Sequence, residues 1–179
     1  MRFEAVHTID GTMAEVERAF LDPRYLDFAR AHHPVLLEAQ VLESKTEGRR
    51  VLRKVRYLPR PVIQKIGPNE VPPQWFQFVE ESTWDPDLHQ LTFKNTPTST
   101  QIANLLHNVG TLRYREVNGR CERRMEGEIS LRLPFLLKPI AVIGEAVIHR
   151  EGLKILDAEV PVMNRFLAEV LRAGTSPAH

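Results

Sequence analysis

Residues 139–172 decide the fold, and they read PIAVIGEAVIHREGLKILDAEVPVMNRFLAEVLR. Apolar residues recur along this stretch at spacings of three and four, which is the period of an amphipathic helix. At about 1.5 Å per residue the helix would be roughly 50 Å long, more than the width of an average sheet. Pro161 removes a backbone donor and crowds the turn at Asp157, so we expect a bend there. We interpret the stretch as one long C-terminal helix that packs on a sheet.

Upstream of this helix, the chain begins with one strand and two short helices. Apolar and polar residues alternate over residues 3–9, which predicts a strand. Thr12 and Glu15 form a capping-box pattern, so we expect a helix to begin there. Asp22 and Pro23 predict a second helix, with Asp22 as its N-cap and proline at its first helical position.

The middle of the chain reads as a succession of strands. Residues 59–73 are rich in proline and predict a loop, and the aromatic residues 75–84 predict a strand. Asn118 and Gly119 predict a type I′ hairpin turn. We therefore predict an α+β fold, in which a curved antiparallel sheet of about six or seven strands wraps around the long C-terminal helix, with two short helices after the first strand.

Composition limits the class of protein. The 179 residues suit one domain, and we expect residues 1–173 to form it and residues 174–179 to be a disordered tail. The hydrophobic content of 42% and the charged content of 26% are typical of a soluble globular protein. A net charge of +1 argues against a nucleic-acid-binding protein. With Cys121 as the single cysteine and no signal-peptide pattern, we expect a cytoplasmic protein without a disulfide or a cofactor.

The order of these elements, the Asp22-Pro23 helix start and the PIAVIGE sequence of residues 139–145 carry a resemblance to a known family. The chain resembles the START-like (SRPBCC, helix-grip) superfamily, and within it an uncharacterised bacterial branch. Residues 81–86, ESTWDP, are similar to the PRELI-type phospholipid-transfer branch. The resemblance implies a cavity under the last helix that binds lipids, sterols, hormones or polyketides. It implies no catalytic motif, because the superfamily shares a shape and no common chemistry.

A few histidine, cysteine and acidic residues are candidates for a chemical role. His7 shares a strand face with apolar residues, so we expect it to point inward, as a core histidine bonded to a neighbour or as a base. Glu145 and His149 lie four residues apart, a spacing that favours a surface pair over a metal site. For Cys121 we favour simple packing. We predict no metal site.

Two arginines share strand faces with apolar residues. Arg53 lies on the face of Tyr57, and Arg123 lies on the face of Met125. A guanidinium group that points inward needs an anion, because an unpaired buried charge is costly. Glu116 could supply the anion from within the protein, and a carboxylate or phosphate of a bound lipid could supply it from outside. A third alternative places each arginine at the rim, with its charged end in water.

We predict a ligand site between the sheet and the C-terminal helix. The residues expected to line it are His7, Arg53, Tyr57, Phe78, Phe93, Tyr114, Arg123, Met125, Ile143, Val147 and Met163. The first hypothesis is a non-catalytic carrier or sensor of a hydrophobic, lipid-like small molecule. The second is a cyclase- or hydrolase-type enzyme, with His7 and an acid such as Glu116 or Glu80 as catalytic groups. The third is a protein-interaction module with a filled interior.

Basic residues cluster in two segments, residues 49–60 and 113–124. If neighbouring strands bring them together, they form a patch that attracts anionic headgroups, and we therefore hypothesise a transient contact with a membrane surface. The alternative is a solvated sheet face on which glutamates balance the charge. We expect no nucleic-acid partner, because few aromatic residues are interleaved with the basic ones.

Overall fold

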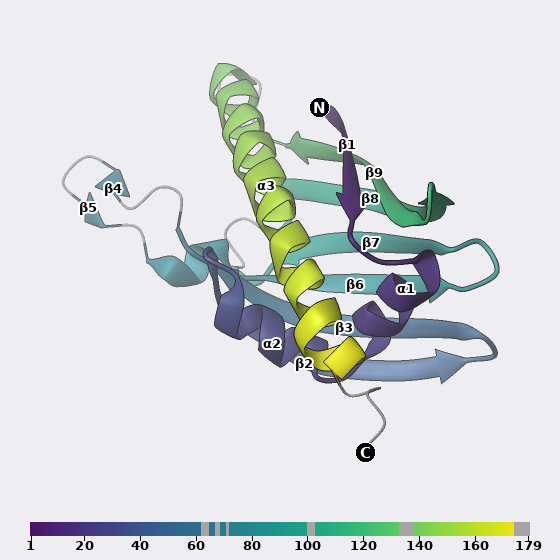
Figure 1. Ribbon diagram of the computed structural model, residues 1–179. Coiled ribbons are helices and arrows are strands. Elements are labelled where there is room, and N and C mark those ends of the chain that lie inside the picture. Colours follow the sequence, from purple (N-terminus) through teal and green to yellow (C-terminus); the bar gives the residue numbers. More distant parts are fainter. Residues whose placement is uncertain (62–64, 67–68, 71, 100–102, 133–137, 174–179) are drawn as a thin grey trace, which may run out of the picture.

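The structure is a computed structural model, and it describes residues 1–61, 65–66, 69–70, 72–99, 103–132 and 138–173 (Figure 1). For residues 65, 66, 69, 131, 138–144 and 147, only the backbone is described. The strands are β1 (Arg2–Ile9), β2 (Leu36–Glu47), β3 (Arg50–Pro59), β4 (Lys65–Ile66), β5 (Asn69–Glu70), β6 (Phe78–Asp85), β7 (Gln90–Pro97), β8 (Leu106–Val117) and β9 (Arg120–Leu131). The helices are α1 (Met13–Leu21), α2 (Tyr25–His32), η1 (Pro73–Phe76), α3 (Lys138–Phe166) and η3 (Leu167–Arg172).

Seven of the strands form one antiparallel sheet in the order β1-β9-β8-β7-β6-β3-β2. The first strand of the chain therefore pairs with the last strand, and β2 forms the opposite edge. Helix α3 crosses one face of this sheet, and α1 and α2 lie beside the C-terminal part of α3 (Figure 1). We call the face that α3 crosses the inner face. The predicted fold class, with its curved sheet, long helix and two short helices after the first strand, is confirmed.

Several local predictions are also confirmed. The Thr12 hydroxyl accepts a hydrogen bond from the Glu15 backbone N–H at 3.2 Å, and the Glu15 carboxylate accepts one from the Thr12 N–H at 2.8 Å. Asn118 and Gly119 have φ angles of 52° and 74°, as a type I′ turn requires. The long helix runs through Pro161 to Phe166 and continues in the π-helical η3.

Other local predictions were wrong. Asp22 does not cap α2: its carboxylate accepts from the backbone N–H and the guanidinium group of Arg24, and α2 begins at Tyr25. Trp75 does not begin a strand, because it lies in η1, and β6 begins at Phe78. The proline-rich segment 59–73 contains the small β4–β5 pair, which projects away from the main sheet (Figure 1). The tail predicted at 174–179 lies outside the described residues.

The hydrophobic core lies where the C-terminal part of α3 meets α1 and the inner face. Phe166, Leu167, Ile9 and Val16 are fully buried there. The principal contacts of α3 with the sheet are to β1 and β9. In the described part of the chain, none of the helices is long and apolar enough to cross a membrane.

An ion pair closes the end of this core. Arg172 of η3 donates to both carboxylate oxygens of Glu15, at 3.0 and 3.1 Å, and to the Asp10 carbonyl at 2.9 Å. Hydrogen bonds from Arg172 and from Thr12 lower the pKa of Glu15 to about 2. The last turns of the chain are thereby fixed to the beginning of α1.

Two facing glycines shape the middle of the inner face. Gly110 of β8 pairs with Gly127 of β9, and the rings of Phe93 and Phe3 lie over them. A Cβ atom on Gly110 would lie 2.5 Å from the Phe93 ring, and one on Gly127 would overlap the Phe3 ring. Only glycine therefore leaves room for the two aromatic rings over these positions.

Candidate functional site

A row of polar side chains crosses the inner face of the central strands. Glu80 of β6 pairs with Asn95 of β7, which in turn pairs with Asn108 of β8. Side chains at paired positions point to the same face, with Cβ atoms roughly 4.5–5.5 Å apart. Each of the three residues is half-buried. We call Glu80, Asn95 and Asn108 the polar row.

The two asparagines of the polar row have unpaired oxygen atoms. The Oδ1 atoms of Asn95 and Asn108 are buried and have no hydrogen-bond partner among the described residues. A buried acceptor without a donor costs about 1–3 kcal/mol, and native proteins rarely tolerate two side by side. Such a pair is therefore a feature that function, and not stability, would explain.

Glu80 is the acidic member of the row. Its pKa is raised to about 7, because burial disfavours the charged carboxylate. The charge of Arg53 and a hydrogen bond from Ser82 act in the opposite direction and only partly offset the burial. A carboxyl group with a pKa near 7 exchanges its proton readily at neutral pH, which suits a general acid or base.

Arg53 points to the inner face, as predicted, and it is tied to α1. Its Nη1 donates to the Phe20 carbonyl at 3.0 Å, and its guanidinium group lies 4.9 Å from the centre of the Phe20 ring. Its Nε is buried and has no partner among the described residues. One donor of Arg53 thus remains available on the inner face.

Arg123 forms a second polar centre, beneath α3. The residue is only 2% exposed, and its Nη1 donates to Glu159 of α3 at 2.5 Å. Its Nη2 donates to the Leu156 carbonyl at 3.2 Å. Although burial alone would lower it, the pKa of Arg123 is raised by the Glu159 carboxylate. Of the alternatives left open by the sequence, the anion for Arg123 comes from within the protein, but from Glu159 and not from Glu116.

His7 connects the second polar centre to the surface of α3. Its Nδ1 lies 3.4 Å from Nη2 of Arg123, which can only donate, so Nδ1 is the acceptor. The proton is therefore on Nε2, which donates to Asp157 at 3.0 Å. Both ring nitrogens are engaged, in agreement with the interpretation of His7 as a core histidine bonded to neighbours.

Glu116 was predicted as an interior acid, and the structure contradicts this. The residue is exposed, and its carboxylate accepts from the Met13 backbone N–H at 3.0 Å. Glu116 does share the face of Tyr114, but β8 extends beyond the area that α3 covers, and the first turn of α1 lies over its end. The carboxylate therefore satisfies a free N–H at the start of α1.

The remaining predicted lining residues divide into two groups. Phe93, Tyr114, Met125 and Met163 are buried in the packed core. Tyr57 and Phe78 are half-buried, with ring centres 5.5 Å apart. The side chains of Ile143 and Val147 lie outside the described residues.

Sequence reasoning missed Asn95 and Asn108 on the inner face, and Glu159 and Tyr25 on the helices that pack against it. Asn95 could have been found, because it lies two residues beyond the inward-facing Phe93 on one strand. The same alternation connects Asn108 to Leu112 of β8. Glu159 and Tyr25 lie on helices, and no strand alternation points to them.

Several solved structures have the same fold as this chain. The ZhuI aromatase/cyclase from Streptomyces sp. R1128 aligns with a TM-score of 0.65 and 15% identity, over 99% of each chain. A Thalictrum flavum norcoclaurine synthase mutant in complex with a transition-state analogue aligns with a TM-score of 0.63 and 11% identity, over 94% of each chain. Ara h 8.0201 aligns with a TM-score of 0.55 and 10% identity, over 94% of this chain and 97% of that chain. The chain adopts the helix-grip fold.

No family model and no curated protein matches the sequence. The predicted resemblance to the START-like, helix-grip superfamily is confirmed at the level of the fold. The finer similarities, to an uncharacterised bacterial branch and to the PRELI-type branch, remain predictions. Identities of 15% and below establish the shape of the helix-grip fold and leave the chemistry to be argued from the site.

Other groups in this helix-grip chain have structural roles. Burial raises the pKa of the Cys121 thiol to about 12, which leaves it an inert packing group. Glu145 lies 3.5 Å from the Met1 amino group, and the His149 ring lies 6.1 Å from the Phe3 ring. Within the described residues, no three His, Cys, Asp or Glu side chains come together as metal ligands would.

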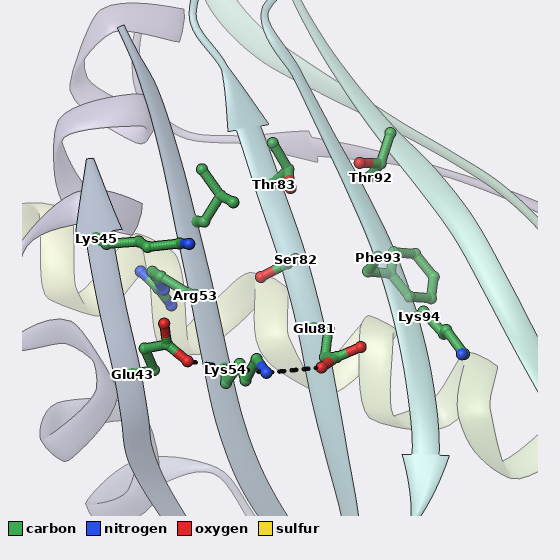
Figure 2. Close-up of a pocket in the computed structure, with 11 residues that line it drawn as sticks. Glu43, Lys45, Arg53, Lys54, Glu81, Ser82, Thr83, Thr92, Phe93 and Lys94 are labelled. Atoms are coloured by element: carbon green, nitrogen blue, oxygen red, sulfur yellow. Dashed lines mark ion pairs between the residues drawn. The ribbon is translucent and has the colours of Figure 1, made fainter. Parts of the chain in front are cut away.

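The outer face of the helix-grip sheet carries a groove of about 430 Å³ (Figure 2). Figure 2 views it with α3 behind the strands, and Lys54 lies between Glu43 and Glu81. The Lys54 ammonium group is 3.1 Å from Glu81 and 3.8 Å from Glu43. Nearby, Arg113 pairs with Glu126 and Arg115 with Glu122. Apart from the inward Arg53 and Arg123, these basic residues therefore lie on a solvated face where glutamates balance several of the charges, which is the second of the two alternatives.

Proposed function

We propose that this helix-grip domain binds a small molecule with a largely apolar body, between the inner face and α3. The coverage of the sheet supports this. Because α3 contacts mainly β1 and β9, the inner faces of β3 and β6 are less closely covered. Tyr57, Phe78 and Glu80 point to this side and remain half-buried, as side chains that border an internal space would be.

One observation carries the proposal: polar atoms between the inner face and the helices that pack on it are buried without partners. Among the described residues they are Tyr25 Oη, Arg53 Nε, Asn95 Oδ1, Asn108 Oδ1 and Arg123 Nε. Apolar pockets with a few placed polar groups are the usual form of small-molecule sites. A ligand that forms hydrogen bonds with some of these atoms would offset the free energy that the unliganded protein loses by burying them without partners.

The apolar share of such a site comes from aromatic and aliphatic side chains. Tyr57 and Phe78 form one wall at the β3–β6 end of the inner face. Phe93, on the neighbouring strand β7, belongs to the buried core. A ligand with a ring system or a long chain would bury its apolar surface there, and each buried methylene contributes about 0.8 kcal/mol.

Native mass spectrometry of the freshly purified protein tests the proposal. We expect a discrete added mass that extracts into solvent as one class of small molecule. Glu80→Trp places a bulky side chain on the inner face and should remove the added mass, whereas Glu81→Trp, one residue away on the outer face, should keep it. An unliganded mass that stays unchanged after incubation with lipid extracts would reject the proposal.

A second candidate function is acid–base catalysis on the bound molecule. The pKa of about 7 at Glu80 favours it, and Tyr57 is close enough for the Glu80 charge to raise the pKa of its phenol further. Glu80→Gln keeps the shape and removes the proton exchange. If the domain is an enzyme, this variant should co-purify with a different molecule, the unreacted precursor, while Glu81→Gln retains the wild-type one. Identical molecules in both variants would leave binding as the function.

The predicted membrane contact and cytoplasmic location remain proposals. The pairing of Lys54, Arg113 and Arg115 with glutamates reduces the attraction of the outer face for anionic lipids. Flotation with vesicles containing anionic lipid would reveal a contact by another surface.

A further inference from the structure

The charges of the inner face are matched within the chain. Arg123 has Glu159 as its anion at 2.5 Å. Arg53 and Glu80 lie on neighbouring strands at diagonal positions, because Arg53 pairs with Ser82 and Glu80 pairs with Val55. Long side chains reach each other across such a diagonal, and the Arg53 charge acts on the Glu80 carboxyl group. Arg123 thus has a carboxylate of the protein bonded to it, and Arg53 lies near enough to Glu80 for its charge to act on that carboxyl group.

This matching changes the expected ligand. A carboxylate or phosphate placed next to Arg53 would also come close to Glu80, and two acids in one desolvated place repel each other. At Arg123, Glu159 and the Leu156 carbonyl already accept from both terminal nitrogens. An anionic headgroup would therefore have to displace Glu159 at Arg123, and at Arg53 it would bring a second acid close to Glu80.

The polar-row groups that lack a hydrogen-bond partner are the neutral side-chain amides of the two asparagines. Asn95 and Asn108 are half-buried as residues, yet their Oδ1 atoms are buried and no described donor reaches them. Rotation of either amide would bring its oxygen to the accessible side, where a hydroxyl group could donate to it. A hydroxyl group also accepts hydrogen bonds, so it can serve the amide N–H groups and the Glu80 carboxyl group next to them.

We propose that Glu80 excludes anionic ligands from the inner face, and that the polar row receives the hydroxyl group of a neutral, largely apolar alcohol or phenol. This inference rests on the proposed function and names its ligand class. It argues against one of the alternatives that the sequence left open, in which a carboxylate or phosphate of a bound lipid meets Arg53 and Arg123.

Three probes with the same bicyclic body test the ligand class: 2-naphthol, 2-methoxynaphthalene and 2-naphthoate. Fluorescence titration at pH 8, where Glu80 is largely ionised, should show 2-naphthol binding about tenfold tighter than the methyl ether, which cannot donate. The carboxylate should bind more weakly still. Equal affinity for 2-naphthol and its methyl ether, or tighter binding of 2-naphthoate, would overturn the inference.

Two pairs of variants test the residues. Glu80→Gln removes the negative charge beside Arg53, so the affinity for 2-naphthoate should rise several-fold, while the matched outer variant Glu81→Gln should leave it unchanged. Asn108→Leu should lose the preference for 2-naphthol over its methyl ether, while Thr111→Val on the outer face of β8 should keep it. Asn95→Leu repeats the test should Asn108→Leu fail to fold. A preference that survives in the asparagine variants, or a 2-naphthoate affinity unchanged in Glu80→Gln, would contradict the proposal.

The molecule extracted in native mass spectrometry separates the two levels of inference. A neutral alcohol or phenol would support both. A molecule with an ionised carboxylate or phosphate would overturn the proposed ligand class and leave the proposed binding function in place. If no mass is found and none of the three probes binds, the binding function is rejected, and the ligand class is rejected with it.

Discussion

The two faces of the sheet use the same residue types in opposite ways. Glu80 and Glu81 are neighbours on β6, but Glu80 points inward with a pKa raised to about 7, and Glu81 points outward and pairs with Lys54. Arg123 and Arg124 are neighbours on β9, but Arg123 is 2% exposed and bonded to α3, and Arg124 is exposed and pairs with Glu4. A step of one residue along a strand therefore changes the environment more than a change of residue type would.

The difference between the faces is one of desolvation. Charges on the outer face keep their water and are screened, so their pairing contributes little to stability. Charges on the inner face have lost much of their water, so each depends on its partner, and a missing partner is expensive. We therefore expect substitutions on the inner face to change the function of this domain, and substitutions on the outer face to be tolerated.

The largest difference is expected from breaking one ion pair on each face. Glu159→Gln leaves the Arg123 charge buried without an anion and should lower the free energy of unfolding by about 3–5 kcal/mol. Glu4→Gln, which breaks the exposed pair with Arg124, should cause no measurable change. Urea denaturation at pH 7 measures both. Similar losses in the two variants would show that the faces do not differ in this way.

The pH dependence of stability should distinguish Glu80 from Glu81. The pKa of Glu80 rises from 4.5 to about 7 on folding, so the folded state binds the proton more tightly than the unfolded state. The resulting stabilisation is complete below about pH 4.5 and is lost as the pH rises through 7, up to about 3 kcal/mol in all. Glu80→Gln should flatten the free energy of unfolding between pH 5 and 8 relative to wild type. Glu81→Gln should retain the wild-type slope, and a flat wild-type curve would contradict the raised pKa.

A steric change should have a smaller effect, again on the inner face alone. Gly127→Ala places a methyl group against the Phe3 ring and 2.7 Å from the Val109 carbonyl oxygen, and we expect a loss of about 1–3 kcal/mol in the free energy of unfolding. Glu128→Ala, on the outer face of the same strand, should lose much less. Phe3→Leu combined with Gly127→Ala should recover part of the loss in thermal denaturation. If the losses of stability of Phe3→Leu and Gly127→Ala simply add in the double variant, the Phe3 ring and the introduced methyl group are not in contact.

The smallest effect is expected in the outer groove. Lys54→Met removes the pairing with Glu43 and Glu81, yet all three side chains are well exposed. Its thermal midpoint should differ from that of wild type only at low salt and should coincide with it at 0.5 M salt or above, on the order of the concentrations that screen surface charge. A large difference that persists in high salt would indicate that the groove is more than a solvated surface.

Much of the fold could be predicted from the sequence, because its signals are local. The capping box at Thr12, the turn at Asn118 and the helical period after residue 139 each depend on neighbours within a few positions. The error at Trp75 has a physical reason as well. Aromatic residues favour strands, but Pro72 and Pro73, three and two residues before Trp75, begin a 3₁₀ turn instead.

Less of the candidate site could be predicted, because it depends on contacts between distant segments. The alternation of β9 correctly placed Arg123 inward, but nothing in β9 indicates that Glu159 of α3 meets it. Alternation also placed Glu116 on the correct face, but could not show that the covered area ends before the strand does. The raised pKa of Glu80 results from burial beneath elements far away in the chain, which no local pattern records.

The pairing of β1 with β9 also has a consequence for how the chain is made. Arg2–Ile9 bond to residues 121–128, so the first strand waits for more than a hundred further residues before its partner is synthesised. At roughly 5–20 residues per second, that delay is on the order of ten seconds on a ribosome. Contacts between segments so distant in sequence form late and slowly. Phe3 and His7 stay exposed to solvent until β1 pairs with β9. During synthesis, β1 therefore remains unpaired for several seconds or more, on the order of the delay above. In that time a chaperone or a neighbouring nascent chain could bind β1.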